Sequence, residues 1–399
     1  MKFDVVQLES TGIDVIDGDR GKNYPHQNEL LSTGFCLFLS AKNVTKSGFS
    51  FSETQFISRR KDALLNNGRL CRGDIVITTR GTVGNVALYS PQVPYENIRI
   101  NSGMLIIRCA NNISNQYLYQ VLRSEWFQKQ IMAVQSGSAQ PQLPKSHFLK
   151  MNIPLPPLPI QEKIASILQL IDDKVMTNNA INNNLEQQAK AIFSNEFLTL
   201  ETLPDGWKQA SLIDIADYLN GLAMQKYRPT ADETGIPVLK IKELRQGCCD
   251  DNSELCSPSI KSEYIIRDGD VIFSWSGSLL VDFWCGGICG LNQHLFKVTS
   301  NKYNKWFYYA WTKHHLDRFI AVAADKATTM GHIKRDELSK AEVLIPNEAD
   351  YNRIGALLQP IYEMIISNRI ENKKLAATRD TLLPKLMNGE IDMSEVDYE

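Results

Sequence analysis

Ile164-Ala-Ser-Ile-Leu-Gln-Leu-Ile171 returns 190 residues later as Ile354-Gly-Ala-Leu-Leu-Gln-Pro-Ile361. Upstream, Arg72-Gly-Asp-Ile-Val-Ile-Thr-Thr79 has a counterpart in Asp268-Gly-Asp-Val-Ile-Phe-Ser-Trp275. In both copies the order is a long variable region, a Gly-Asp strand, a short helical stretch, an Ile-Pro pair and a long helix. The 399-residue chain is therefore a duplicated unit, long enough for several domains that each bury a core.

The repeated stretch opens a long amphipathic helix in each copy. Prolines between residues 154 and 159 separate the first helix from the region before it, because proline cannot continue a helix. Apolar residues in both helices follow alternating steps of four and three, which is the spacing of a coiled-coil seam. They are Ile164, Leu168, Ile171, Val175, Leu185 and Ile192, then Ile354, Leu358, Ile361, Ile365, Leu375 and Leu382. The pattern predicts helices over residues 161–197 and 353–386 that pack against each other.

Asparagines interrupt both seams at matched positions. They are Asn178 and Asn182 in the first helix, and Asn368 and Asn372 in the second. A buried asparagine in a seam lowers stability but fixes the register, because a mispaired helix leaves its amide without a partner. The alternative explanation is that the duplication copied solvent-facing residues.

The variable regions are predicted to be rich in strands. Residues 74–80 and 270–275 are runs of β-branched and aromatic residues, and Gly73 and Gly269 are expected to close a turn before each run. Residues 115–131 and 304–321 carry apolar side chains at helical spacing, so one helix is expected in each. The fold class is therefore α+β. Two mixed α/β regions, 1–153 and 202–345, are each followed by a helical segment, 154–201 and 346–399.

Charge and composition restrict the class of protein. The formal net charge is −2, but residues 1–153 hold 17 Lys and Arg against 11 Asp and Glu. DNA-binding chains are usually basic, so a DNA role predicts that a partner supplies part of the phosphate-binding charge. The sequence shows neither a membrane span nor a signal peptide, and we expect a cytoplasmic protein. The eight cysteines lack the repeated C-x2-C spacing of a zinc site, so we interpret them as reduced, mostly buried thiols.

Motifs of catalysis are missing from the sequence. We find no G-x-x-x-x-G-K-[ST] phosphate loop, no Asn/Asp-Pro-Pro-Tyr/Phe adenine-methylation motif, no G-x-G-x-x-G turn and no HExxH. The chain is therefore interpreted as a binding subunit without catalytic, metal or cofactor-binding residues.

Several sequence motifs of the chain resemble those of the specificity subunit of type I restriction–modification systems. Ile153-Pro-Leu-Pro-Pro-Leu-Pro-Ile-Gln-Glu-Lys-Ile164 resembles the end of that family's recognition domain, and Leu203-Pro-Asp-Gly-Trp207 the start of its second one. Leu383-Pro-Lys-Leu-Met-Asn-Gly-Glu-Ile391 resembles the family's C-terminal tail. The second copy departs from the pattern at residues 345–352, where the Gln-Glu pair is absent, and at residues 324–331.

This resemblance implies a specific architecture and set of partners. Each variable region would be a target-recognition domain that reads one half of a split, asymmetric site in double-stranded DNA. The helices would form an antiparallel coiled coil whose length sets the gap between the half-sites. Two methylation subunits and two motor-nuclease subunits would bind, and S-adenosylmethionine, ATP and Mg would be bound by those partners, with no cofactor on this chain.

Polar and basic residues on glycine-bearing loops are the candidate DNA contacts, because major-groove reading needs such groups at base edges. Trp275 is expected either to stack on a base or to belong to the core. The first domain offers Arg20, Lys22, Tyr24, Thr79, Arg80, Thr82, Ser136, Ser138, Gln140, Gln142 and Lys145. The second offers Lys226, Tyr227, Arg228, Trp275, Ser276, Ser278, Lys326, Thr328, Thr329, His332 and Lys334.

Two other classes of function remain open at this point. One is a DNA-independent helical scaffold that organises partner proteins. The other is a nuclease with an unrecognised active site, which would cleave DNA without partners.

Overall fold

The computed structural model describes residues 3–134, 141–325 and 335–393. The chain divides into two compact units. Unit 1 holds Met1–Asp173 and Ala376–Glu399, and unit 2 holds Lys174–Leu375. The boundary between the units therefore falls inside both long helices, and each unit contains a stretch of each.

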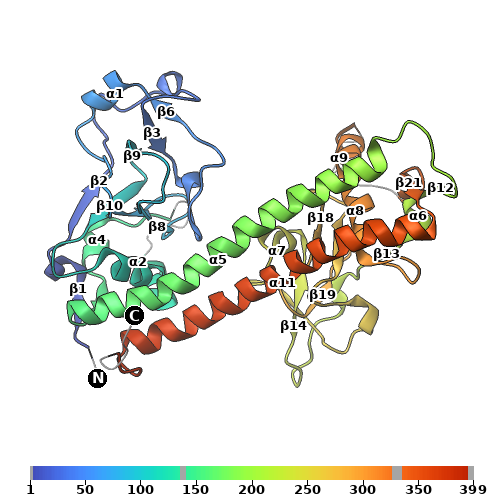
Figure 1. Ribbon diagram of the computed structural model, residues 1–399. Coiled ribbons are helices and arrows are strands. Elements are labelled where there is room, and N and C mark those ends of the chain that lie inside the picture. Colours follow the sequence, from blue (N-terminus) through green and yellow to red (C-terminus); the bar gives the residue numbers. More distant parts are fainter. Residues whose placement is uncertain (1–2, 135–140, 326–334, 394–399) are drawn as a thin grey trace. The chain divides into compact units, whose positions relative to one another are not determined.

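Unit 1 is built on a four-stranded antiparallel sheet with the order β2-β10-β7-β8 (Figure 1). Its strands are β2 (Asp14–Asp17), β10 (Met104–Arg108), β7 (Ile75–Thr78) and β8 (Val86–Leu88). A second sheet has the order β6-β3-β9, with β3 parallel to β9. The remaining strands form two pairs, β1-β11 and β4-β5. These strands are β6 (Phe56–Ile57), β3 (Cys36–Leu39), β9 (Ile98–Ile100), β1 (Val5–Gln7), β11 (Asn152–Pro154), β4 (Val44–Thr45) and β5 (Gly48–Phe49).

Unit 2 repeats this topology. Its main sheet has the order β13-β20-β17-β18, and in its second sheet, β15-β14-β19-β16, the pair β14·β19 is again parallel. The main strands are β13 (Asp217–Asn220), β20 (Leu295–Thr299), β17 (Val271–Ser274) and β18 (Leu280–Phe283). The others are β15 (Leu255–Cys256), β14 (Ile236–Leu239), β19 (Cys289–Leu291), β16 (Ile265–Ile266), β12 (Lys208–Ser211) and β21 (Glu342–Ile345). The α+β class and the duplication are thus confirmed at the level of strand order.

The predicted Gly-Asp strands occupy equivalent places, as β7 and β17. Gly73 and Gly269 have φ values of 91° and 85°, so each closes a turn in the left-handed region that favours glycine. The aspartates that follow hold basic side chains. Asp74 accepts from Nε and Nη2 of Arg108 at 2.9 and 2.7 Å, and Asp270 pairs with Lys297 at 3.0 Å. The Gly-Asp motif therefore anchors the central strands, because its glycine closes a turn and its aspartate binds a basic side chain.

Each predicted short helix is two helices. The single helices expected over 115–131 and 304–321 were wrong in this respect. Ser124 breaks the first, because its backbone is extended (φ −61°, ψ 147°). Its Oγ accepts from the N–H of Phe127 and so caps the start of a second helix. The second pair is separated at His315. The shorter α-helices are α1 (Arg59–Leu64), α2 (Asn115–Arg123), α3 (Glu125–Val134), α4 (Lys145–Leu149), α6 (Leu212–Ile215), α7 (Ile241–Gln246), α8 (Lys305–His314), α9 (Leu316–Asp325) and α10 (Arg335–Ser339).

The two long helices are present as expected. Helix α5 runs over Leu158–Phe193 and continues as a π-helical turn to Leu198, and α11 runs over Glu348–Met387. Helix α5 begins three residues before the predicted start, and Pro159 lies in its first turn, where no backbone donor is needed.

The long helices pair antiparallel inside each unit (Figure 1). In unit 1, Asp172 of α5 binds Arg379 of α11 at 2.9 Å, and Ile164 and Leu168 share a core with Leu383 and Leu386. In unit 2, the asparagines of both helices hydrogen-bond across the seam. None of the helices in the described ranges is long and apolar enough to cross a membrane.

Gln161, the glutamine of the Gln-Glu pair, joins α5 to the region before it. It is fully buried, and its Oε1 accepts from the backbone N–H of Ser114, the residue that caps α2, at 2.9 Å. Its Nε2 donates to the carbonyl oxygens of Pro156 at 2.8 Å and Asn112 at 3.2 Å. In the second copy the residue 190 positions later is Tyr351, whose hydroxyl accepts from the N–H of Asn304 at 2.7 Å. The motif is absent there, but its contact to the cap of α8 is kept.

Candidate nucleic-acid interface

Three loops of unit 1 meet where the strands of its main sheet end, on one side of the sheet. Strand β10 pairs antiparallel with both β2 and β7, and this register places Leu105 beside Asp17 and Met104 beside Thr78. The residues that follow β2 and β7 therefore lie next to the turn that precedes β10, at residues 101–103. We call these loops, together with residues 141–145, the first loop edge.

Backbone hydrogen bonds hold Thr79 and Arg80 at the first loop edge. Their N–H groups donate to the carbonyl oxygen of Gly103 at 2.8 and 3.3 Å. The carbonyl oxygen of Thr79 accepts from the N–H of Leu143 at 3.1 Å, and Arg80 forms an isolated bridge with Gln142. The structure thus brings together the predicted residues Thr79, Arg80 and Gln142.

Arg20 lies on the same edge but is already paired. Its Nη2 contacts Asp17 at 3.1 Å and the carbonyl oxygen of Ser102 at 3.4 Å. Asp19 fixes this loop, because its carboxylate accepts from the N–H groups of Gly21 and Asn66, both at 2.7 Å. Burial alone would raise the pKa of Asp19, but these backbone donors outweigh burial and hold the pKa below its ordinary value of 3.8.

The other predicted contacts of unit 1 differ in their availability. Lys22 and Thr82 are exposed, whereas Thr79 is buried. The ring of Tyr24 packs edge-on against Phe38 at 5.7 Å. The ammonium of Lys145 donates to the carbonyl oxygen of Val15, so part of its hydrogen-bonding capacity is used within the domain.

A groove of about 610 Å³ adjoins the first loop edge. One wall is the segment that contains β4, with Lys42, Thr45 and Lys46, and the other is the turn with Thr82 and Asn85. Nδ2 of Asn85 ties the walls together by donating to the carbonyl oxygen of Val44 at 2.9 Å. A hydrogen bond therefore joins the two walls of the groove, and the walls carry basic and hydroxyl side chains.

Unit 2 has an equivalent edge, the second loop edge, built from different side chains. Trp275 follows β17, is half-buried, and stacks on Phe296 at 5.6 Å, while its Nε1 donates to Oδ1 of Asn220 at 3.0 Å. Ser276 is buried, and its Oγ lies 3.1 Å from Nδ1 of the exposed His294. Trp275 thus contributes to packing and also leaves part of its ring at the surface.

The remaining predicted contacts of unit 2 are spread along the neighbouring loops. Arg228 pairs with Glu254 at 2.9 Å, and Ser278 accepts from Nη1 of Arg245 at 3.2 Å. Lys226 and Tyr227 are exposed.

Eight predicted residues lie outside the residues that the structure describes. They are Ser136, Ser138, Gln140, Lys326, Thr328, Thr329, His332 and Lys334.

Sequence reasoning missed several residues that the fold places at these edges. In unit 2 they are Asn220, Arg245, Gln293 and His294, and in unit 1 they are Lys42, Lys46 and the turn at residues 101–103. One signal was present in the sequence. Asn101 and Asn292 each precede a hydrophobic strand, and their side chains accept from the N–H groups of Gly103 and His294 at 2.9 and 3.2 Å. Such turns mark a strand start, but they do not show which other loops lie beside it.

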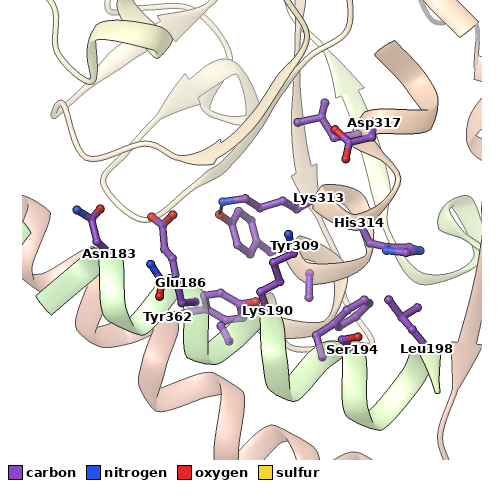
Figure 2. Close-up of a pocket in the computed structure, with 15 residues that line it drawn as sticks. Asn183, Glu186, Lys190, Ser194, Leu198, Tyr309, Lys313, His314, Asp317 and Tyr362 are labelled. Atoms are coloured by element: carbon purple, nitrogen blue, oxygen red, sulfur yellow. Dashed lines mark hydrogen bonds between the residues drawn. The ribbon is translucent and has the colours of Figure 1, made fainter. Parts of the chain in front are cut away.

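A separate hollow of unit 2, about 630 Å³, lies between the end of α5 and the helices α8 and α9 (Figure 2). Tyr309 and Tyr362 form part of its lining, and Lys313 donates to the hydroxyl of Tyr309 at 2.9 Å. Glu186 and Asp317 also line it. Burial lowers the pKa of His314 at its edge, which favours the neutral imidazole. With charges of both signs and a neutral histidine, this hollow is a poor match for DNA phosphates, unlike the groove of unit 1.

Among the described residues, no group of three or more His, Cys, Asp or Glu side chains is placed to hold a metal ion.

The chain matches the family model described as "Type I restriction modification DNA specificity domain" twice, over residues 11–187 and 204–377. It is 26% identical over 350 residues to the specificity subunit of the type I restriction enzyme MjaIX of Methanocaldococcus jannaschii, covering 82% of this chain and 79% of that protein. It is 20% identical to the HindI specificity subunit of Haemophilus influenzae, covering 94% and 98%. Its fold is similar to the crystal structure of a type I system S subunit from M. genitalium, with a TM-score of 0.56 at 13% identity over 97% of this chain and 96% of that one.

Proposed function

The chain belongs to the family of type I restriction–modification DNA specificity domains, and we propose that it reads a split, asymmetric DNA target for a type I restriction–modification complex. We assign residues 1–153 and 202–345 to two target-recognition domains. Residues 154–201 and 346–399 are assigned to the spacer helices and the C-terminal tail. The chain performs no catalysis in this proposal.

One observation carries the proposal. The same loop edge occurs in both units, on the same strand order, with different side chains. Two residues after the central strand, unit 1 has the exposed Arg80 and unit 2 the buried Ser276, which contacts His294. Because direct readout depends on which donors and acceptors face the bases, two edges of different chemistry read two different half-sites. A shared scaffold with divergent loops is the arrangement expected of a reader of two unlike sequences.

The helices α5 and α11 would act as the spacer. Helices of 36 and 40 residues extend about 54–60 Å at ~1.5 Å per residue. Half-sites one turn of DNA apart lie ~34–36 Å from each other, so the helices are long enough to set such an interval. Their length would then determine the gap between the two half-sites.

Partners complete the activity in this proposal. The chain has a net charge of −2 and therefore no excess of positive charge for a phosphate backbone, so part of the phosphate-binding charge would come from two methylation subunits and two motor-nuclease subunits. S-adenosylmethionine, ATP and Mg would be bound by those subunits. The expected location is the cytoplasm, where the DNA is.

The decisive experiment is to co-express the chain with its methylation subunit and to map methylated adenines across the host genome. We expect one bipartite motif with unlike halves and a fixed gap. The complex should also bind DNA with an affinity that falls steeply with salt. A complex that neither methylates a defined motif nor binds DNA in a salt-sensitive way would contradict the proposal and favour a scaffold that organises proteins without DNA.

A further inference from the structure

Two other loops hold the backbone of Arg80. Its N–H donates to the carbonyl oxygen of Gly103 at 3.3 Å, and it bridges to Gln142 on a third loop. Gly81 follows with φ 74°, so the chain turns immediately after Arg80. The position from which the side chain projects is therefore fixed before any ligand binds, which lowers the entropy lost on binding.

The guanidinium of Arg80 is exposed and, within residues 3–134, 141–325 and 335–393, has neither an ion-pair nor a hydrogen-bond partner. The neighbouring Arg20 differs, because Asp17 and the carbonyl oxygen of Ser102 occupy its Nη2. Beside Arg80 stands Gly103, where an added Cβ would lie 3.7 Å from the Cβ of Arg80. Since Gly103 carries no side chain, nothing at that position covers the guanidinium.

Arg80 lies at the centre of the first loop edge, and the lysines lie at its rim. Its contacts come from the turn at 101–103 and from Gln142, whereas Lys42, which pairs with Glu53 at 3.0 Å, and Lys46 line the far wall of the adjoining groove. Rim lysines on a flexible stem suit phosphates, which can be bound as point charges. A central guanidinium with a fixed origin suits a base edge, where two donors must meet two acceptors at once.

Resting on the proposed function, we propose that Arg80 reads a guanine of the first half-site in the major groove. Two guanidinium N–H groups would donate to O6 and N7 of that guanine, the pair of acceptors that only guanine presents there. The equivalent residue of unit 2 is the buried Ser276, so the second domain has no such reader at this place.

The test uses the complex with its methylation subunit and compares Arg80→Lys, Arg80→Gln and the rim control Lys46→Gln. The methylation motif is mapped for each, and relative methylation rates are measured on duplexes with each base at every motif position. Arg80→Lys keeps the charge but loses the planar pair of N–H donors. The preference for one guanine should therefore fall roughly 10- to 100-fold, while the base preferences at all other motif positions stay unchanged. Lys46→Gln should weaken binding to all sequences alike and reduce the salt dependence.

The outcomes separate this inference from the proposed function. A first half-site without guanine, or an Arg80→Gln variant that binds more weakly but keeps its motif, overturns the assignment of Arg80 and leaves the proposed function intact. A wild-type complex without a defined motif overturns both. Equal melting temperatures of wild type and variants show that any change in the motif comes from the lost contact and not from unfolding.

Discussion

Asn368 donates from Nδ2 to Oδ1 of Asn182 at 2.9 Å, and both side chains are buried between α11 and α5. A second pair lies one turn away, where Asn178 donates to Oδ1 of Asn372 at 2.8 Å. Adding the 190-residue repeat to Asn178 and Asn182 gives Asn368 and Asn372, so the two pairs are equivalent contacts of the duplicated sequence. Three of these asparagines are buried and Asn372 is half-buried, so they are not solvent-facing copies.

The first prediction concerns this pair. Asn182→Leu leaves Asn368 with an unpartnered amide in a buried seam, and we expect it to lower the free energy of unfolding by about 1–3 kcal/mol. Asn182→Leu combined with Asn368→Leu should regain most of the loss, because both polar groups are removed together. Urea denaturation of the two variants measures this difference.

Thr177→Ala, at an exposed position of the same helix, is the control and should change stability by less than ~0.5 kcal/mol. A double variant that is no more stable than the single one would argue against the pair as a register device. The loss of register itself would be seen as a mixture of helix pairings in cross-linking, since two leucines pack in more than one alignment.

A second prediction separates the two residues of the Gln-Glu pair. Gln161→Ala removes three hydrogen bonds and leaves the N–H of Ser114 without its acceptor, so unfolding should become easier by about 2–3 kcal/mol. Glu162→Ala is the matched control, because Glu162 is exposed. Thermal melting should shift clearly for Gln161→Ala and hardly at all for Glu162→Ala. Equal shifts would show that the buried glutamine is not what joins α5 to α2.

Local and periodic features of the fold were predictable from the sequence. The seam between α5 and α11 was visible in the sequence as apolar residues spaced three and four positions apart. The glycines before β7 and β17 marked the turns that the structure contains. Ser124 could have been identified as a break, but apolar spacing continues across it and hides the second cap. The replacement of Gln161 by Tyr351 in the second copy could not be anticipated, because an amide and a phenol differ in size and shape even though both can accept a hydrogen bond from a backbone N–H.

The loop edges were predictable only in part. Thr79, Arg80 and Gln142 were identified by residue type, yet their meeting depends on β10 pairing with both β2 and β7. Lys46 and His294 were missed for the same reason: their approach to other loops follows from long-range strand pairing, which one sequence does not reveal. Arg228 had the right chemistry, but Glu254, 26 residues away, binds its guanidinium.

A third prediction concerns pH. Asp172 accepts from Arg123 and Gln120 at 2.8 Å and from Arg379 at 2.9 Å. Burial alone would raise the pKa of this carboxyl, but Arg123, Gln120 and Arg379 together outweigh burial and hold it below 3.8. Because the folded pKa is the lower one, the contacts stabilise the fold above the unfolded pKa and are lost as the pH falls through the folded value.

Asp172→Asn should therefore lower the free energy of unfolding by about 1.5–3 kcal/mol at pH 7. This gap in stability between wild type and variant should close below about pH 4. Urea denaturation of both proteins between pH 3 and pH 7 measures it. Asp173→Asn is the control, since Asp173 is exposed and, among the residues that the structure describes, its carboxylate accepts a hydrogen bond from Gln169 alone. A gap between wild type and Asp172→Asn that stays constant down to pH 3 would contradict the role given to the carboxylate.

The last prediction tests the spacer. Seven residues of helix-forming sequence are inserted after Ala180 in α5 and after Ile370 in α11. Each insertion then falls between the two asparagines of its helix, and a heptad keeps the seam facing the partner helix. Seven residues add about 10.5 Å, or about three base-pair steps of ~3.4 Å, so the gap in the methylation motif should grow by about three base pairs. Both half-sites should stay unchanged, because neither loop edge is touched.

The same insertion in α5 alone moves Asn182 away from Asn368 and should destabilise the chain instead. A motif whose half-site bases change while the gap stays the same would refute the division of labour between helices and loops.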